Sequence, residues 1–249
     1  MAIRHDGLTV DWLGYATVRI ETPDGTVVYL DPGRYGVLTG EWRPDTEGVE
    51  HPPARDYDAR DGDVVCVTHV HHYDPDGIRR VAREDATLVV FEGIDVRDTE
   101  RDVERPADLP YDRIEVGTED ETVAAGVPMW TVPAYNHPDG PNVRSDGTPV
   151  HPEGFGCGFL LSAGGTRVFW PGDTDVLDGH AELEVSLFLP SIARNFTMDR
   201  HDAAALAESM DPDLVLPIHY NTFGALEADS AAFAADVAGR GVPVVLDER

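Results

Sequence analysis

Residues 64–74 read Val64-Val65-Cys66-Val67-Thr68-His69-Val70-His71-His72-Tyr73-Asp74, an apolar run that breaks into three histidines and an aspartate. A short apolar run of this kind is typical of a buried strand. In an extended chain His69 and His71 point the same way, because side chains alternate along a strand. Two imidazoles at one strand end form a chelating pair for a borderline-soft divalent metal. The segment therefore predicts a metal site at the end of a buried strand.

Three further segments place a metal-binding side chain just after an apolar strand. These side chains are His137 and His151 in the loop after residue 132, Asp173 after Trp170, and His219 after Ile218. Histidines and carboxylates that gather at strand ends along one rim could hold one or two metals and leave a position open for water.

Two nearby aspartates each admit two roles. Asp74 precedes Pro75 and so suits the N-cap of a helix, and its carboxylate equally suits a metal. Asp31 precedes Pro32 and suits either a turn or a partner that orients a ligand histidine. The remaining histidines are expected on the surface; they are His5, His51, His180 and His201.

The composition is strongly acidic. The chain has 249 residues and a formal net charge of −28, and all 19 of its basic residues are arginines. Acidic residues spread along the whole chain are typical of a protein from an extreme halophile, where net charge maintains solubility. The alternative is a protein that binds cations or basic proteins. At molar salt the Debye length is only ~3 Å, so the overall charge does not decide whether the substrate is anionic.

No long uncharged apolar stretch predicts a membrane span, and residues 1–6 run directly into charge rather than into a secretory signal. Two cysteines, Cys66 and Cys157, are too few for a disulfide framework. We therefore expect a cytoplasmic protein without a membrane partner, and the sequence leaves homo-oligomerisation open.

The order of elements predicts the layers. Strands are expected first in bulk, at 8–13, 17–21 and 27–30, and then in alternation with helices at 75–83, 199–210 and 230–239. The segments 33–62 and 133–156 are expected to be long loops, which in compact domains are usually functional or disordered. This order favours an α+β fold with two sheets face to face and helices outside them, in one domain over residues 1–249.

Several segments also match family motifs in order along nearly the whole chain. They are Asp11-Trp12-Leu13-Gly14-Tyr15-Ala16-Thr17, Asp31-Pro32, Thr68-His69-Val70-His71, Ala134-Tyr135-Asn136 with His151-Pro152-Glu153-Gly154-Phe155-Gly156-Cys157-Gly158-Phe159, Pro171-Gly172-Asp173-Thr174-Asp175, and Leu216-Pro217-Ile218-His219-Tyr220-Asn221-Thr222. Together they resemble the motifs W-L-G-H-A-T, D-P, T-H-x-H-x-D-H, A-Y-N…H-P-x-G-x-G-x-G-F, G-D-T-D and P-x-H-Y-x-T of the metallo-β-lactamase superfamily. The resemblance is closest to its small metal-dependent hydrolases, which include the ascorbate-6-phosphate lactonases.

The resemblance implies a four-layer αββα sandwich with the metals at one edge. The first metal would take His69, His71 and a histidine of the second long loop. His151 fits the H-P-x-G motif better, whereas His137 lies nearer the end of the strand. The second metal would take the D-H pair of the T-H-x-H-x-D-H motif together with His219. Asp173 would bridge the two metals.

The chain departs from the pattern at two places. Tyr15 stands where the opening motif has histidine, and Tyr73-Asp74 stands where the family has the D-H pair. In direct register Tyr73 replaces the aspartate and Asp74 the histidine; with one residue inserted, Asp74 is the aspartate and His72 the second histidine. Either register keeps Asp74 and loses one ligand of the second metal. Tyr73 and Asp31 are expected to lie behind the ligands.

The expected function is that of a metal-dependent hydrolase. A bound metal lowers the pKa of its water to about 7, and the resulting hydroxide attacks an ester, lactone or phosphoester of a small molecule. Asp173 is expected to orient the nucleophile and accept its proton, and Asp74 is the second candidate for a catalytic carboxylate. One or two divalent ions are expected; zinc suits the histidine and carboxylate donors best, with manganese or iron as alternatives.

Two other functions compete with this expectation. A nuclease or phosphodiesterase of the same fold would need arginine contacts to nucleic acid, and Arg79, Arg80 and Arg83 form a small helical group. That group is more typical of a solvated helix face, so a nucleic-acid partner is not expected. Because Tyr73 weakens the expected second site, the second alternative is a non-catalytic protein with a single structural metal.

Overall fold

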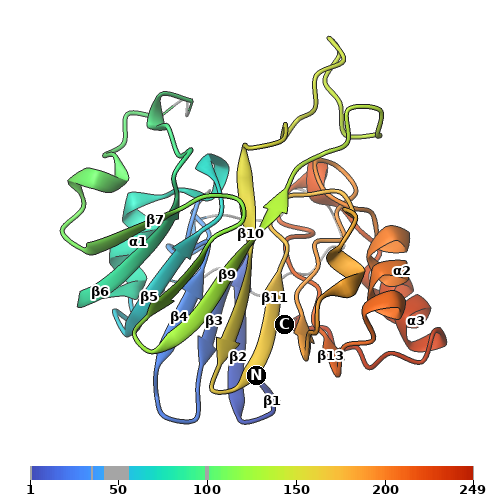
Figure 1. Cartoon of the computed structure of the whole chain (residues 1–249), viewed down its shortest axis with the longest axis horizontal. Helices are drawn as coiled ribbons and strands as arrows, with labels where there is room; N and C mark the ends of the chain where they lie inside the picture. Colours follow the sequence, from blue (N-terminus) through green and yellow to red (C-terminus); the bar gives the residue numbers. More distant parts are fainter. Residues whose placement is uncertain (1, 35, 42–55, 99–100, 249) are drawn as a thin grey trace.

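The computed structural model describes residues 2–34, 36–41, 56–98 and 101–248. The strands of this part of the chain form two sheets (Figure 1). Helix α1 lies on one outer side of the sheets, and α2 and α3 lie on the other (Figure 1). The arrangement is the αββα sandwich of the metallo-β-lactamase fold, so the expected fold class is confirmed.

The first sheet has seven strands in the order of the sequence. They are β1 (Ile3–His5), β2 (Leu8–Gly14), β3 (Thr17–Glu21), β4 (Val27–Leu30), β5 (Gly62–Val67), β6 (Ala82–Phe91) and β7 (Asp112–Val116). Strands β1 to β4 pair antiparallel, and β4 to β7 pair parallel. Helix α1 (Pro75–Val81) lies between β5 and β6 in the chain.

The second sheet has the order β13-β12-β11-β10-β9-β8. Its strands are β8 (Glu121–Ala124), β9 (Val127–Ala134), β10 (Gly156–Ala163), β11 (Thr166–Trp170), β12 (Leu187–Phe188) and β13 (Leu214–Val215). Helices α2 (Arg200–Met210) and α3 (Ser230–Gly239) cover it. Short 3-10 turns occur at Val70–His72, Val96–Asp98, Pro106–Asp108, His180–Glu182 and Gly224–Leu226.

Strand β5 shows why a central strand is apolar throughout. Val64 and Cys66 pack in the cluster shared by the two sheets, whereas Val65 and Val67 pack with Ile78 of α1. Because successive side chains of a strand point to opposite faces, a strand with apolar layers on both sides has no polar position. The uninterrupted apolar run at 64–67 is the sequence signature of this middle layer.

The long antiparallel strands and all three helices lie where the sequence places them, within a few residues. Two strands were missed, β1 and β7. Strand β7 is an edge strand whose residues are mostly exposed, so its sequence lacks the apolar alternation that marks a strand. Helix α1 ends at Val81 instead of 83, because β6 already begins at Ala82.

The topology brings several strand ends to one edge of the sandwich. Parallel pairing puts the ends of β4 and β5 together, and likewise the ends of β11, β12 and β13. The end of β9 and the start of β10 meet at Ala134 and Gly156, and the bridge between His69 and Gly156 joins this point to the first sheet. The loop between β9 and β10 extends beyond the sheets at this edge (Figure 1).

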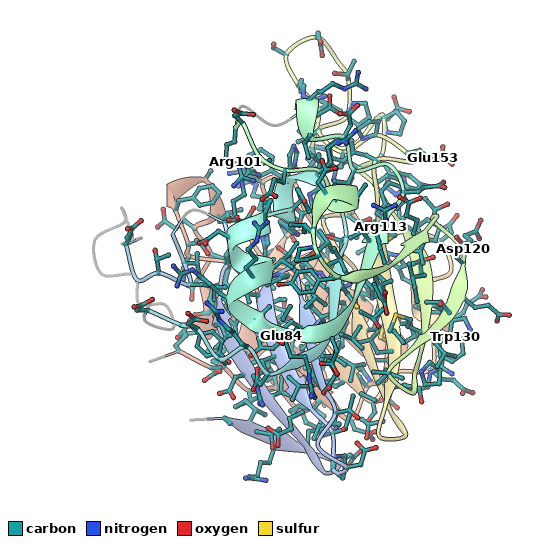
Figure 2. All side chains as sticks on the ribbon, turned by 90° about the vertical axis from the view of Figure 1, so that its left-hand side faces the viewer. Glu84, Arg101, Arg113, Asp120, Trp130 and Glu153 are labelled. Atoms are coloured by element: carbon teal, nitrogen blue, oxygen red, sulfur yellow. The ribbon has the colours of Figure 1, made fainter. Side chains whose placement is uncertain are left out.

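Carboxylates lie all around the surface, and oxygen atoms mark the outline of the molecule in Figure 2. The arginines of α1 pair with them: Arg79 contacts Glu104, Arg80 contacts Asp56 and Asp76, and Arg83 contacts Asp63 and Asp85. An arginine group neutralised in this way gives no support to nucleic-acid binding. No helix in the described part of the chain has the length and apolar character needed to cross a membrane.

Candidate metal centre

The segment after β5 turns sharply and presents three histidines. His69 is extended, with φ −166° and ψ 176°, and residues 70–72 then form a 3-10 turn. The alternation expected of an extended strand therefore stops before His71. Instead, the turn brings His71 and His72 to the His69 ring, with ring centroids 5.1 and 4.3 Å away. His72, which matches the family motif only with one residue inserted, thus lies in the centre.

The first candidate site consists of His69, His71 and His151. One nitrogen of each ring lies within 4.8 Å of the others. His71 Nδ1 and His151 Nε2 are 3.1 Å apart. Three imidazole nitrogens around one point are the donor set of many zinc sites, which keep a fourth position for water or substrate.

The second candidate site consists of His72, His219 and Asp173. The Nε2 atoms of the two histidines are 3.0 Å apart, and Asp173 Oδ1 lies 3.6 Å from the first and 3.5 Å from the second. His219 follows β13 on a left-handed residue with φ 57°, and its N–H donates to the Tyr15 carbonyl. Together these contacts turn its ring toward His72.

Asp173 lies between the two candidate sites. While Oδ1 faces His72 and His219, Oδ2 lies 3.7 Å from Nε2 of His69 and 3.7 Å from Nε2 of His151. The carboxylate therefore faces four imidazoles from the middle. This is the position that a ligand shared by two metals would occupy.

Asp31 is fully buried behind the histidines and accepts four hydrogen bonds. Its Oδ1 accepts from the Thr68 N–H at 2.8 Å, and its Oδ2 accepts from Trp170 Nε1 at 2.7 Å, from His72 Nδ1 at 2.9 Å and from the Thr68 hydroxyl at 2.9 Å. The bond from His72 Nδ1 fixes the tautomer in which Nε2 carries the free lone pair. The sequence prediction that Asp31 orients a ligand histidine therefore has a matching geometry.

His151 is held by a second polar network. Its Nδ1 lies 3.2 Å from Asn136 Oδ1 and 3.1 Å from the Phe196 carbonyl, and its N–H donates to Asn136 Oδ1 at 3.0 Å. Asn136 in turn donates to Asp175 and to the Phe196 carbonyl. Asn136 belongs to the A-Y-N motif at the end of β9, which is its signal in the sequence, but no role was predicted for it.

Burial keeps the histidines neutral. It lowers the pKa of His71 to about 4, of His151 to about 3 and of His219 to about 4, and it lowers the pKa values of His69 and His72 well below the usual range. Burial also raises the pKa of Asp31 to about 6, and it raises the pKa of Asp173 well above the usual range of an aspartate. Neutral imidazoles are the form that binds a metal, and a cation would replace the proton on Asp173.

Three residues proposed from the sequence lie elsewhere. Asp74 caps α1: its Oδ1 accepts from the N–H groups of Asp76 and Gly77, its Oδ2 accepts from the Arg34 N–H, and it belongs to none of the metal-binding groups among the described residues. Tyr73 packs in the cluster under α1 and donates to the Glu104 carbonyl. His137 is exposed, with its Nε2 3.1 Å from the Val176 carbonyl.

The four remaining histidines were expected on the surface, and this expectation holds for some of them only. The prediction is wrong for His180, which is buried and whose Nδ1 accepts a hydrogen bond from the Leu177 N–H. His5 is half-buried and contacts Ser186, and His201 is exposed as expected. His51 lies outside the described residues.

Two buried atoms test whether the residues fit a metal. In the described part of the chain, His69 Nε2 and Asp173 Oδ1 are buried and have no hydrogen-bond partner. A buried polar atom without a partner costs about 1–3 kcal/mol, so such atoms are rare unless something else satisfies them. Both atoms face the middle of the centre, where a divalent cation would bind them. The donor set therefore fits one or two metal ions.

A cavity of about 230 Å³ opens onto this centre. It is lined by His71, His151, Asp173 and His219. The other lining residues are Tyr15, Arg34, Val150, Phe196, Phe223 and Leu226. A small, largely apolar cavity beside convergent histidines is typical of a substrate site.

The comparisons with known proteins agree with this geometry. Residues 9–219 match the family model described as a beta-lactamase superfamily domain. The chain is also 30% identical over 247 residues to the UPF0173 metal-dependent hydrolase of Methanopyrus kandleri, covering 95% of this chain and 94% of the relative. The chain belongs to the metallo-β-lactamase superfamily and its UPF0173 metal-dependent hydrolase family. The resemblance found in the sequence is thereby confirmed at the level of the superfamily.

Solved structures of metallo-β-lactamase-fold proteins are similar in fold. Igni18, a metallo hydrolase from Ignicoccus hospitalis, has a TM-score of 0.65 at 20% identity, with 97% of this chain and 95% of that chain covered. The metallo-β-lactamase fold protein YhfI from Bacillus subtilis has a TM-score of 0.62 at 11% identity, with 94% and 90% covered. At these identities the likeness concerns the fold. The candidate ligands of this UPF0173 protein are therefore assigned from its own geometry.

Proposed function

We propose that this UPF0173 protein hydrolyses a small ester or lactone at a two-metal centre. The first metal would bind His69, His71 and His151, the second would bind His72 and His219, and Asp173 would bridge them. The observation that carries the proposal is the position of Asp173, whose two oxygens lie 3.5–3.7 Å from four histidine nitrogens. His72 would supply a ligand to the second metal, for which the family's D-H pair reads Tyr73-Asp74 in this chain.

The donor set is rich in imidazole and therefore favours zinc. Manganese and iron are alternatives, because carboxylate and imidazole ligands also suit them. When bound, a divalent metal supplies a nucleophile at neutral pH by lowering the pKa of water, and it polarises the substrate carbonyl. The protein contributes ligand orientation. Asp31 fixes the tautomer of His72, and the Phe196 carbonyl and Asn136 fix that of His151.

Asp173 has a second role in this proposal. Its carboxylate lies in the middle of the centre and beside the cavity, where it can orient an attacking water and accept its proton. The small size of the cavity favours a small-molecule substrate over a polynucleotide. The ion-paired arginines of α1 give the nuclease alternative no supporting observation.

The test combines metal analysis with activity. The purified protein is expected to bind about two divalent ions per chain, and the metal-loaded protein is expected to hydrolyse members of an ester and lactone panel in high salt. Asp173→Asn should reduce kcat by about a hundredfold or more while the protein stays folded, since a positioned general base contributes about 10²–10⁴-fold. Full metal loading without turnover on any ester or lactone would instead support the non-catalytic alternative.

The localisation and assembly of the protein stay predictions from the sequence. We propose a cytoplasmic protein with a single domain over residues 1–249, and we leave its oligomeric state to a sedimentation measurement. The acidic surface supports the proposal of adaptation to concentrated salt.

A further inference from the structure

The cavity beside the metal centre has two chemically distinct walls. Tyr15, Phe196, Phe223 and Leu226 supply aromatic and aliphatic surface. Among the described lining residues, Arg34 contributes the one guanidinium. A cavity of about 230 Å³ is smaller than the 300–1,000 Å³ of typical drug-sized sites, and it suits a molecule the size of one substituted ring.

Arg34 is held at the rim of the centre by its own backbone. It follows the Asp31-Pro32-Gly33 turn in a left-handed conformation with φ 84°, and its N–H donates to Asp74 Oδ2 at 2.9 Å. Its side chain donates to the His71 carbonyl. This hydrogen bond places the guanidinium close to the candidate ligands. A non-glycine residue with positive φ carries strain, which the Asp74 cap holds in place.

Phe196 is held in the opposite wall in a comparable way. It too is left-handed, with φ 72°. Its N–H donates to Asn142 Oδ1 at 2.9 Å, and its carbonyl accepts from Asn136 at 2.9 Å and contacts His151 Nδ1. The network that orients the metal ligand His151 therefore also fixes an aromatic residue of the cavity.

Building on the hydrolase function proposed above, we propose that the substrate carries an apolar ring and one oxyanion. The ring packs against Phe196, Phe223 and Leu226, and the oxyanion binds the guanidinium of Arg34. The planar guanidinium fork matches a carboxylate or a phosphate. Arg34 is then a specificity residue, and the scissile ester or lactone carbonyl lies next to Asp173.

The test compares two esters with the same scissile bond, phenyl acetate and 4-acetoxybenzoate, which adds one carboxylate to the ring. In both reactions a water oxygen bonds to the acyl carbon, the bond from that carbon to the phenolic oxygen breaks, and acetate, a phenol and a proton are released. The readout is the ratio of kcat/KM for the anionic ester to that for the neutral ester. Differences in leaving group are the same for every variant and cancel when ratios are compared.

We expect Arg34→Gln to lower this ratio by about tenfold or more, mainly through KM of the anionic ester, because a charge-assisted hydrogen bond is lost. Arg34→Lys should restore part of the ratio, since it keeps the charge without the fork. Phe196→Ala should lower kcat/KM for both esters and leave the ratio near that of the unmodified protein. The matched control is Arg144→Gln. Arg144 is exposed, and its charge also acts on His71 and His151, but it does not line the cavity.

A ratio unchanged by Arg34→Gln, or lowered equally by Arg144→Gln, would overturn the assignment of Arg34. Calorimetric binding of 4-hydroxybenzoate, with phenol as the neutral control, gives a second readout that needs no turnover. Binding of 4-hydroxybenzoate that depends on Arg34, without hydrolysis of any ester or lactone, would contradict the hydrolase function and support the anion site. Binding that persists in Arg34→Gln would place the carboxylate on the metal and overturn the inference.

Discussion

Asp31 orients the candidate ligand His72 from behind. It is fully buried, it accepts from Thr68, Trp170 and His72, and burial raises its pKa to about 6. At neutral pH it is therefore a carboxylate whose charge is satisfied by four donors. A buried acceptor with four donors is sensitive to any change in its donor or acceptor pattern.

We predict that Asp31→Asn weakens binding of the second metal by about 10- to 100-fold, the usual effect of losing a partner of a ligand histidine. An asparagine presents N–H groups where Asp31 accepts from Trp170, His72 and Thr68. A titration with Zn²⁺ followed by elemental analysis measures the change. Metal binding equal to that of the unmodified protein would show that His72 needs no such partner.

A pair of histidine variants tests the loop ligand. We expect His151→Ala to lower the metal content and the activity, because His151 Nε2 lies 3.1 Å from His71 Nδ1. His137→Ala, the matched control, should leave the metal content unchanged, because His137 is exposed and contacts the Val176 carbonyl. The reverse result would reassign the ligand to His137. Elemental analysis of the two purified variants decides between the two histidines.

At the scale of elements, the contact between the two sheets positions His69. Strand β10 begins at Gly156, which bridges to His69, and a Cβ at Gly156 would lie 2.8 Å from the Cβ of His69. Only a glycine allows the two backbones to approach this closely. The geometry of the first ligand therefore depends on a residue of the other sheet.

We predict that Gly156→Ala displaces His69 and lowers the metal content of the first site, with a thermal midpoint several degrees lower. Gly239→Ala is the control: Gly239 is the last residue of α3 and has open space around its Cβ position, so alanine there should be neutral or stabilising by up to about 1 kcal/mol. Metal analysis and differential scanning calorimetry distinguish the two. Full metal binding by Gly156→Ala would contradict the proposed contact.

The buried His180, in the 3-10 turn His180–Glu182, makes the stability of the folded protein depend on pH. Burial lowers the pKa of His180 to about 4, below its usual value near 6.5. Because the unfolded chain then takes up the proton first, stability is lost as the pH falls from 6.5 toward 4 and is unaffected above 6.5. We predict that His180→Gln removes about 1–3 kcal/mol of this loss. Urea unfolding of the two metal-loaded proteins at pH 7.5 and 5 measures it, and equal pH dependence would contradict the prediction.

At the scale of the whole molecule, the net charge of −28 governs the response to salt. Repulsion among surface carboxylates destabilises the compact state, and salt reduces it as the Debye length falls from about 10 Å at 0.1 M to about 3 Å at 1 M. Acidic residues are spread along the whole sequence, and oxygen atoms lie all around the outline of the molecule in Figure 2.

We therefore predict that the thermal midpoint rises steadily between 0.1 and 2 M KCl. Screening does not depend on the identity of the anion, so KBr at the same concentration should act in nearly the same way. Calorimetric scans in both salts, with sucrose as an uncharged control, measure the effect. A midpoint that is independent of KCl would show that the acidic surface is already compensated at low salt.

Local chemistry determined much of this protein in advance. Apolar runs that end in histidine or aspartate marked β5, β11 and β13, because a strand between two apolar layers has no polar position until it leaves the sheet. The motifs around those runs identified the superfamily and the fold by resemblance, and they named His69, His71, Asp173 and His219 together with either His151 or His137. It also presented Asp31 as a partner of a ligand histidine.

Only the tertiary structure decided which residues share the centre. Asp74 had equal reasons to cap a helix or to bind a metal, and the Arg34 N–H together with α1 holds it as a cap. The 3-10 turn at residues 70–72 brought His72 in beside His219, and the Asn136 network selected His151 over the exposed His137. Such choices depend on side chains far apart in the chain, and spacing in the sequence carries no information on which of them meet.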